Sequence, residues 1–172
     1  PADYLTARFS GRATANQCTS FMQIISDNRS VPSVGWHPEL VAATRIDADK
    51  LPEAVAAGST VGTVLPSVAE TLGLSPDTAV LSGINDTQAG AIAAGAFDGE
   101  HAGLALGTTS VLVTHHDRKK VDPIRTLYTM PNPLGSGHLL SAENGVAGVA
   151  VDHFLDTIVY PMLADMACRT IS

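Results

Sequence analysis

A carboxylate at the junction between a predicted strand and a predicted helix is the first group in this sequence that could do chemistry. Asp86 follows the apolar run 79–84, which predicts a buried strand, and precedes the small residues 87–97, which predict a helix. Ligands of α/β proteins bind at the carboxyl ends of strands, and a helix N-terminus favours a negative charge. Asp86 could therefore accept a proton from a substrate hydroxyl. On this segment alone, a helix N-cap is the simpler explanation of the same residue.

A polar turn between two apolar runs is the second candidate. Gly107, Thr108 and Thr109 separate the runs 102–106 and 110–114, which predict strands. Backbone N–H groups and hydroxyls at such a turn can hold phosphate oxygens. A hairpin turn with polar tips is the simpler explanation of this segment alone. No Lys follows the glycine, so the turn is not a Walker A loop, and the GxGxxG pattern is also absent.

A third segment, 143–148, joins a predicted strand to a glycine-punctuated helix. Gly145 and Gly148 would let the backbone approach a ligand closely. Close packing of the helix on the sheet explains these glycines equally well.

Metal and hydrolase chemistry are not predicted. Six histidines are present, but no HExxH or similar spacing occurs, and the adjacent His115 and His116 should point to opposite faces of a strand. No serine lies in a GxSxG setting. We therefore expect no metal bound by histidines and no nucleophile elbow.

The composition of the 172 residues is that of an ordinary globular protein, with 45% hydrophobic and 16% charged residues. The net charge is −7 and no stripe of Lys or Arg occurs, which argues against nucleic acid as a partner. No apolar run reaches membrane-spanning length, so no membrane contact is predicted. Cys18 and Cys168 lie far apart and form no CxxC pair. We expect two reduced, half-buried thiols in a cytoplasmic protein.

The elements that must position the candidate residues alternate between helices and strands. The predicted helices are 3–8, which Gly11 ends, 38–43, 66–72, 87–97 and 146–158. The predicted strands are 61–65, 79–84, 102–106, 110–114 and 138–142, while 17–25 is a strand or a buried turn. Residues 117–137 hold three prolines and are expected to be irregular. This order predicts an α/β fold with a mixed sheet.

Taken in order, these segments resemble the FGGY carbohydrate kinases. Residues 3–11 (DYLTARFSG) are similar to the family pattern DYLxxRLTG, and 51–62 (LPEAVAAGSTVG) to LPxxxxxGxxxG. Residues 83–90 (GINDTQAG) resemble GGxDxxAA, and 107–110 (GTTS) resemble the family's GTS turn. Residues 16–23 fall where the family often has D-x-S/T-x-A beside the sugar.

The resemblance implies a fold of two ribonuclease-H-like domains, as in actin and the hexokinases, with a cleft between them. Residues 1–97 would be the C-terminal part of the N-terminal, sugar-binding domain. Residues 98–172 would be the beginning of the C-terminal, nucleotide-binding domain. The family's N-terminal phosphate loop and its C-terminal adenosine motif are absent from the sequence. We therefore expect an internal fragment, without kinase activity in isolation.

The resemblance also implies an activity, which is ATP-dependent phosphorylation of a sugar or polyol hydroxyl. Asp86 would be the general base. Gly107, Thr108 and Thr109 would bind the transferred phosphate, and Gly148 would lie near the nucleotide. Mg²⁺ would arrive with ATP and be held mainly by residues outside this chain.

On the substrate side, the resemblance implies contacts from Asp86, Thr87, Gln17 and Cys18. Thr87 is a shorter hydroxyl where some relatives carry an amide. Asn16 and Cys18 depart from the commoner acid and hydroxyl, so the substrate-side contacts are less firmly implied than the base.

Several alternatives stay open. The GTS-like turn favours a ketopentose such as xylulose as substrate. Glycerol kinase is the second choice, because its relatives more often carry GDQQ where this chain has NDTQ at 85–88. A non-catalytic, actin-like ATP-binding module is the alternative of another class. A homodimer of the full-length protein is also compatible with the resemblance.

Overall fold

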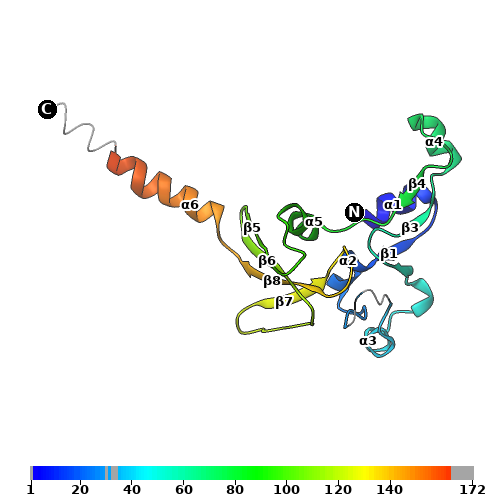
Figure 1. The fold of residues 1–172 in the computed structure, drawn as a ribbon, viewed down its shortest axis with the longest axis horizontal. Coiled ribbons are helices and arrows are strands. Elements are labelled where there is room, and N and C mark those ends of the chain that lie inside the picture. The colour runs from blue at the N-terminus through cyan, green and yellow to red at the C-terminus, as the bar shows by residue number, and fades with distance from the viewer. Residues whose placement is uncertain (1, 30, 32–34, 164–172) are drawn as a thin grey trace.

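A four-stranded antiparallel sheet lies at the centre of the computed structural model, which describes residues 2–29, 31 and 35–163 (Figure 1). Its strands run in the order β5-β6-β8-β7. They are β5 (Ala102–Leu106), β6 (Ser110–His116), β7 (Leu127–Pro131) and β8 (His138–Asn144). The predicted strands 102–106, 110–114 and 138–142 are confirmed, and the latter two extend further.

Helix α5 (Asp86–Ala93) packs on this sheet and shares its core. The buried cluster joins Ala91 and Ala96, at the helix and just after it, to Val113, Met130 and Leu139 of the sheet. These residues come from both sides of the predicted domain boundary at residue 97, and the boundary itself stays a prediction.

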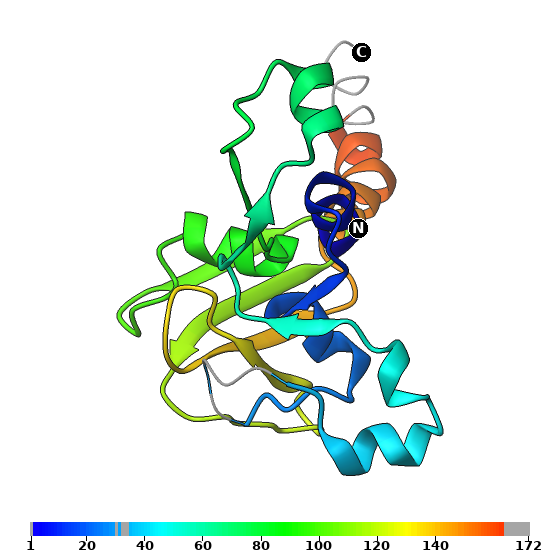
Figure 2. The ribbon, with the colours of Figure 1, turned by 90° about the vertical axis from the view of Figure 1, so that its right-hand side faces the viewer.

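The first eighty residues form smaller units beside the sheet. Strand β1 (Thr14–Asn16) pairs in parallel with β2 (Glu53–Val55), and β3 (Thr60–Thr63) pairs antiparallel with β4 (Ala79–Leu81). The helices are α1 (Ala2–Ser10), α2 (Gln17–Ser20), α3 (Pro38–Thr44) and α4 (Pro66–Leu72), with short 3₁₀ turns η1 (Phe21–Gln23) and η2 (Ala48–Lys50). Helices α3 and α4 lie at opposite ends of this part in both views (Figure 1, Figure 2).

Local sequence explains the ends of the confirmed helices. Gly11 follows α1 and Gly73 follows α4, each with a positive φ, of +74° and +66° respectively. That left-handed conformation costs glycine little and ends a helix. Pro38 and Pro66 begin α3 and α4, where the missing N–H of proline leaves no hydrogen bond unmade.

Three local predictions were wrong. Residues 17–23 are helical, because the buried Asn16 side chain accepts hydrogen bonds from Cys18 N and Thr19 N and so starts α2. The run 79–84 forms a strand only at β4, and it is not buried, since Leu81 is 54% exposed. The prolines of 117–137 do not prevent β7, because Pro131 occupies the last position of that strand, which lies at the edge of the sheet.

The last described helix begins two residues later than predicted. Helix α6 (Gly148–Phe154) continues into a π-helical turn, η3 (Leu155–Val159), and extends away from the sheet (Figure 1). No helix within the described ranges is long and apolar enough to cross a membrane.

Candidate active site

Asp86 is the first residue of α5, and it is not the residue that caps the helix. Asn85 is the N-cap, since its side-chain Oδ1 accepts a hydrogen bond of 2.8 Å from Gln88 N. The carboxylate of Asp86 accepts one hydrogen bond, of 2.8 Å, from Thr87 N and is otherwise exposed. The helix-cap explanation of Asp86 is therefore wrong, and its carboxylate remains available to a ligand.

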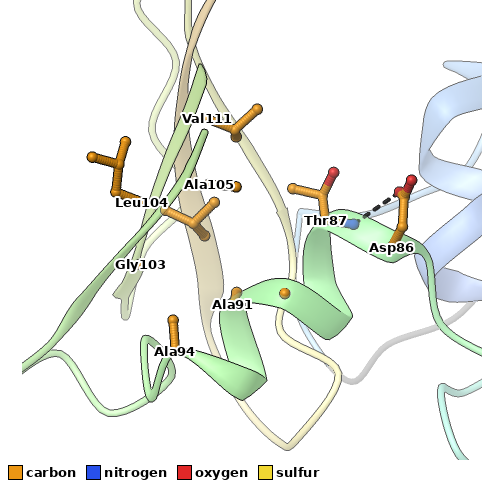
Figure 3. Close-up of a pocket in the computed structure, with 10 residues that line it drawn as sticks. Asp86, Thr87, Ala91, Ala94, Gly103, Leu104, Ala105 and Val111 are labelled. Atoms are coloured by element: carbon orange, nitrogen blue, oxygen red, sulfur yellow. Dashed lines mark hydrogen bonds between the residues drawn. The ribbon is translucent and has the colours of Figure 1, made fainter. Parts of the chain in front are cut away.

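A cavity of about 110 Å³ lies between α5 and the β5–β6 hairpin (Figure 3). Asp86 and Thr87 supply its polar groups from the first turn of the helix. The remaining lining is apolar and comes from small or branched residues of α5, of the segment that follows it and of the two strands: Gly90, Ala91, Ala94, Gly103, Leu104, Ala105, Val111 and Val113. The candidate base thus borders a cavity whose opposite wall, built by the hairpin, is apolar.

The hairpin carries the predicted phosphate-binding turn directly beyond this wall. Ala105 pairs with Val111, and the next pair, Leu106 with Ser110, closes the turn 107–109. Gly107 N donates a hydrogen bond of 2.8 Å to Thr109 O, so that N–H is already used. The side-chain hydroxyls of Thr108 and Thr109 have no partner among the described residues, and Thr108 is exposed. These hydroxyls are free to form hydrogen bonds with a ligand at the turn.

Gly148 lies against the same turn. Its backbone nitrogen donates to Gly107 O at 2.8 Å, and Ala147 N donates to Thr108 O at 2.9 Å. A Cβ atom on Gly148 would lie 2.6 Å from Gly107 O, so only glycine fits without a shift of the backbone. The structure therefore brings together Gly107, Thr108 and Gly148, which the sequence predicted on the nucleotide side.

Gln17 and Cys18, predicted beside the substrate, are both buried. Cys18 has no exposed surface, and burial raises the pKa of its thiol to about 12, although a hydrogen bond from the Gln88 side chain opposes this shift. Gln17 is 4% exposed and lines a separate cavity of about 240 Å³ with Ala56 and Asn132. Neither residue lines the cavity of Asp86, and their contact with a substrate stays a prediction.

Sequence reasoning missed the long-range contacts of the two amide side chains beside the base. Asn85 Nδ2 donates to Cys18 O at 3.0 Å, and the buried Gln88 donates from Nε2 to Pro131 O at 2.5 Å. The pattern N-x-x-Q at 85–88, an Asn cap followed three residues later by Gln, is a capping signal that could have pointed to Asn85.

No cluster of three His, Cys, Asp or Glu side chains that could hold a metal occurs within the ranges that the structure describes. His115 interacts through Nε2 with Asp117 at 3.2 Å and through Nδ1 with Asn132. Both ring nitrogens of His115 thus have side-chain partners among the described residues.

Comparison with known proteins identifies the family. The N-terminal domain of the FGGY family of carbohydrate kinases matches residues 1–93. The xylulose kinase of Bacillus subtilis (strain 168) is 32% identical over 87 residues, which are 51% of this chain and 17% of that protein. The chain therefore belongs to the FGGY family of carbohydrate kinases.

Solved structures share its mixed α/β fold. A ligand-bound xylulose kinase from Lactobacillus acidophilus is 21% identical, with a TM-score of 0.78, over 91% of this chain and 31% of that one. Glycerol kinase of Plasmodium falciparum with ADP is 17% identical, with a TM-score of 0.73, over 90% of this chain and 31% of that one. The chain spans about a third of the length of these structures.

Proposed function

We propose that this chain is part of an ATP-dependent carbohydrate kinase in which Asp86 is the general base. The supporting observation is the cavity that the exposed residue Asp86 lines together with Ala105 and Val111. Ala105 pairs with Val111 in the hairpin, and only the pair of Leu106 with Ser110 separates them from the turn that carries Thr108 and Thr109. The candidate proton acceptor therefore lines a cavity whose hairpin wall leads to the turn with the free hydroxyls of Thr108 and Thr109, although these two residues do not line the cavity itself.

The proposed reaction needs one proton acceptor and a site that stabilises charge. The Asp86 carboxylate accepts the proton of a sugar or polyol hydroxyl while that oxygen forms its bond to the γ-phosphorus of ATP and the bond to the ADP oxygen breaks.

The residues at the β5–β6 turn fit an anionic phosphate. Thr108 and Thr109 carry hydroxyls without partners in the described chain, and Gly148 keeps α6 close to the turn. When bound, ATP supplies the phosphoryl group and Mg²⁺ neutralises part of its charge. In line with the family resemblance, we propose that Mg²⁺ is held mainly by residues outside this chain.

A ketopentose such as xylulose is the proposed substrate. Its support is the 32% identity to the Bacillus subtilis xylulose kinase and the GTS-like turn. Glycerol is the second candidate, because glycerol kinase of Plasmodium falciparum shares the fold. The accessible carboxylate of Asp86 speaks against a non-catalytic, actin-like ATP-binding module.

The remaining expectations are proposals of the same kind. They are the two ribonuclease-H-like domains divided near residue 97, a cytoplasmic location, a homodimer of the complete protein, and no kinase activity in the isolated 172 residues.

A panel of acceptors tests the proposed function. The complete protein that contains this chain is assayed for ADP formation with ATP, Mg²⁺ and D-xylulose, glycerol or D-gluconate. We expect acceptor-dependent ADP formation, fastest with D-xylulose. ADP formation that no acceptor increases would contradict a carbohydrate kinase, and a preference for glycerol would replace the ketopentose.

A further inference from the structure

The start of α5 is held by side chains whose partners lie far away in the sequence. Asn85 precedes Asp86 and donates to the carbonyl of Cys18, 67 residues earlier. Gln88 follows two residues after Asp86 and donates to the carbonyl of Pro131, 43 residues later. The one exposed carboxylate of this turn therefore lies between two long-range anchors.

The side-chain amides of Asn85 and Gln88 make different contacts. Asn85 uses Oδ1 to cap α5, by accepting from Gln88 N, and uses Nδ2 to reach Cys18 O. Gln88 has no exposed surface, and its side chain contacts both the Pro131 carbonyl, at the end of β7, and the Cys18 thiol. The first turn of α5 is thereby tied to α2 on one side and to the sheet on the other.

The anchor on the α2 side is itself fixed. Asn16 is fully buried, caps α2 through Oδ1 and donates from Nδ2 to Asp3 Oδ1 at 2.8 Å. Thr19 Oγ1 donates to the other oxygen of Asp3 at 2.5 Å. A continuous series of hydrogen bonds thus runs from Asp3 in α1, through α2, to the residue that precedes the base. Buried polar networks with satisfied members rigidify their surroundings.

We propose that Asn85 and Gln88 are positioning residues, which hold the first turn of α5 against Cys18 and Pro131 and thereby fix the carboxylate of Asp86. The inference rests on the proposed role of Asp86 as the base. Neither residue needs to touch the substrate, since both act through the helix that carries Asp86. Misplacement of a reacting group by about 1 Å can cost about 100-fold in rate.

Two variants separate this role from simple helix capping. Asn85→Ser keeps a good capping oxygen, but its short side chain cannot reach Cys18 O. Gln88→Met keeps the volume and removes the Nε2 donor, together with an Oε1 that has no hydrogen-bond partner in the structure. Ser141→Ala is the control, because Ser141 is fully buried and its hydroxyl also has no partner.

The experiment measures kcat and KM of the complete protein with the best acceptor among D-xylulose, glycerol and D-gluconate, well below the unfolding midpoint of each variant. We expect Asn85→Ser and Gln88→Met to lower kcat by about 10- to 100-fold while the KM for ATP changes less than about twofold. Ser141→Ala should keep the wild-type kcat.

Parallel assays of Asp86→Asn keep this inference separable from the proposed function. If Asp86→Asn is inactive while both amide variants are folded and keep kcat within about twofold of wild type, the base assignment stands and the positioning role is overturned. The same holds if only KM changes. If Asp86→Asn keeps its activity, the proposed function itself fails.

Discussion

The backbone nitrogen of Gly148 donates a hydrogen bond of 2.8 Å to the carbonyl oxygen of Gly107. This contact joins the start of α6 to the turn between β5 and β6, 41 residues earlier in the chain. It leaves no room for a side chain, because a Cβ atom on Gly148 would lie 2.6 Å from the carbonyl oxygen. Glycine at 148 therefore has a packing role at the turn, whichever ligand the turn binds.

Gly148→Ala should weaken the use of ATP. The new methyl group would push the start of α6 and the 107–109 turn apart, and so displace the free hydroxyls of Thr108 and Thr109. In steady-state kinetics of the complete protein, we expect kcat/KM for ATP to fall by about 10- to 100-fold.

Gly145→Ala is the matched control for this substitution. A Cβ atom at Gly145 would meet nothing within 4 Å, so kcat/KM for ATP should stay within about twofold of wild type. Equal effects of the two substitutions would mean that the contact with Gly107 does not shape the ATP site.

Gly103→Ala should destabilise the packing of α5 on the sheet. A Cβ atom on Gly103 would lie 2.8 Å from the Cβ of Ala94 and 3.4 Å from that of Ala96, and neither short side chain can move aside. Urea unfolding should show a loss of about 1–3 kcal/mol in the free energy of unfolding.

Gly90→Ala, in the interior of α5, should instead raise the free energy of unfolding. A Cβ atom there meets nothing within 4 Å, and alanine is a better helix former than glycine by up to about 1 kcal/mol. Stabilisation by both alanines would show that β5 does not pack closely against the end of α5.

The buried thiol of Cys18 should make stability fall at alkaline pH. Burial raises its pKa from 9.0 to about 12, so between these values the unfolded chain loses a proton that the folded protein keeps. The stabilisation is fully present below about pH 9 and is lost as the pH rises towards 12.

Proteins with Cys18 and with Cys18→Ala are compared in a Cys168→Ser background, since Cys168 lies outside the described residues. From pH 8 to pH 10, the free energy of unfolding should fall by about 1.4 kcal/mol more with Cys18 present than with Cys18→Ala. If the free energies of unfolding of the two proteins change in parallel between pH 8 and pH 10, Cys18 is exposed to water in the folded protein.

Local signals predicted the elements that carry the candidate site. The alternation of apolar runs, turns and small residues indicated α5, β5, β6 and β8, because each element has its own periodicity or its own capping residue. The same local signals could not distinguish Asn85 from Asp86 as the cap, since both residue types accept hydrogen bonds from a helix N-terminus.

Long-range packing decided the points that the sequence left open. The buried Cys18 contacts Gln88, 70 residues later, and its carbonyl accepts a hydrogen bond from Asn85. Strand β7 forms because β8 offers it a partner, although the prolines around it weaken every local strand signal. The family resemblance placed Cys18 beside the sugar; the structure shows that it is buried against Gln88 of the helix that carries Asp86, and its contact with a substrate stays a prediction.

The rate of acceptor-dependent ATP consumption by Asp86→Asn is the most direct test of Asp86 as the base. Asparagine keeps the size and the acceptor oxygen for Thr87 N but cannot take up a proton. Asp77→Asn, an exposed carboxylate in a turn, is the matched control. With the best acceptor, we predict that Asp86→Asn lowers kcat at least about 100-fold, while Asp77→Asn stays within about twofold of wild type. Acceptor-dependent ATP consumption by Asp86→Asn at the wild-type rate would contradict the account.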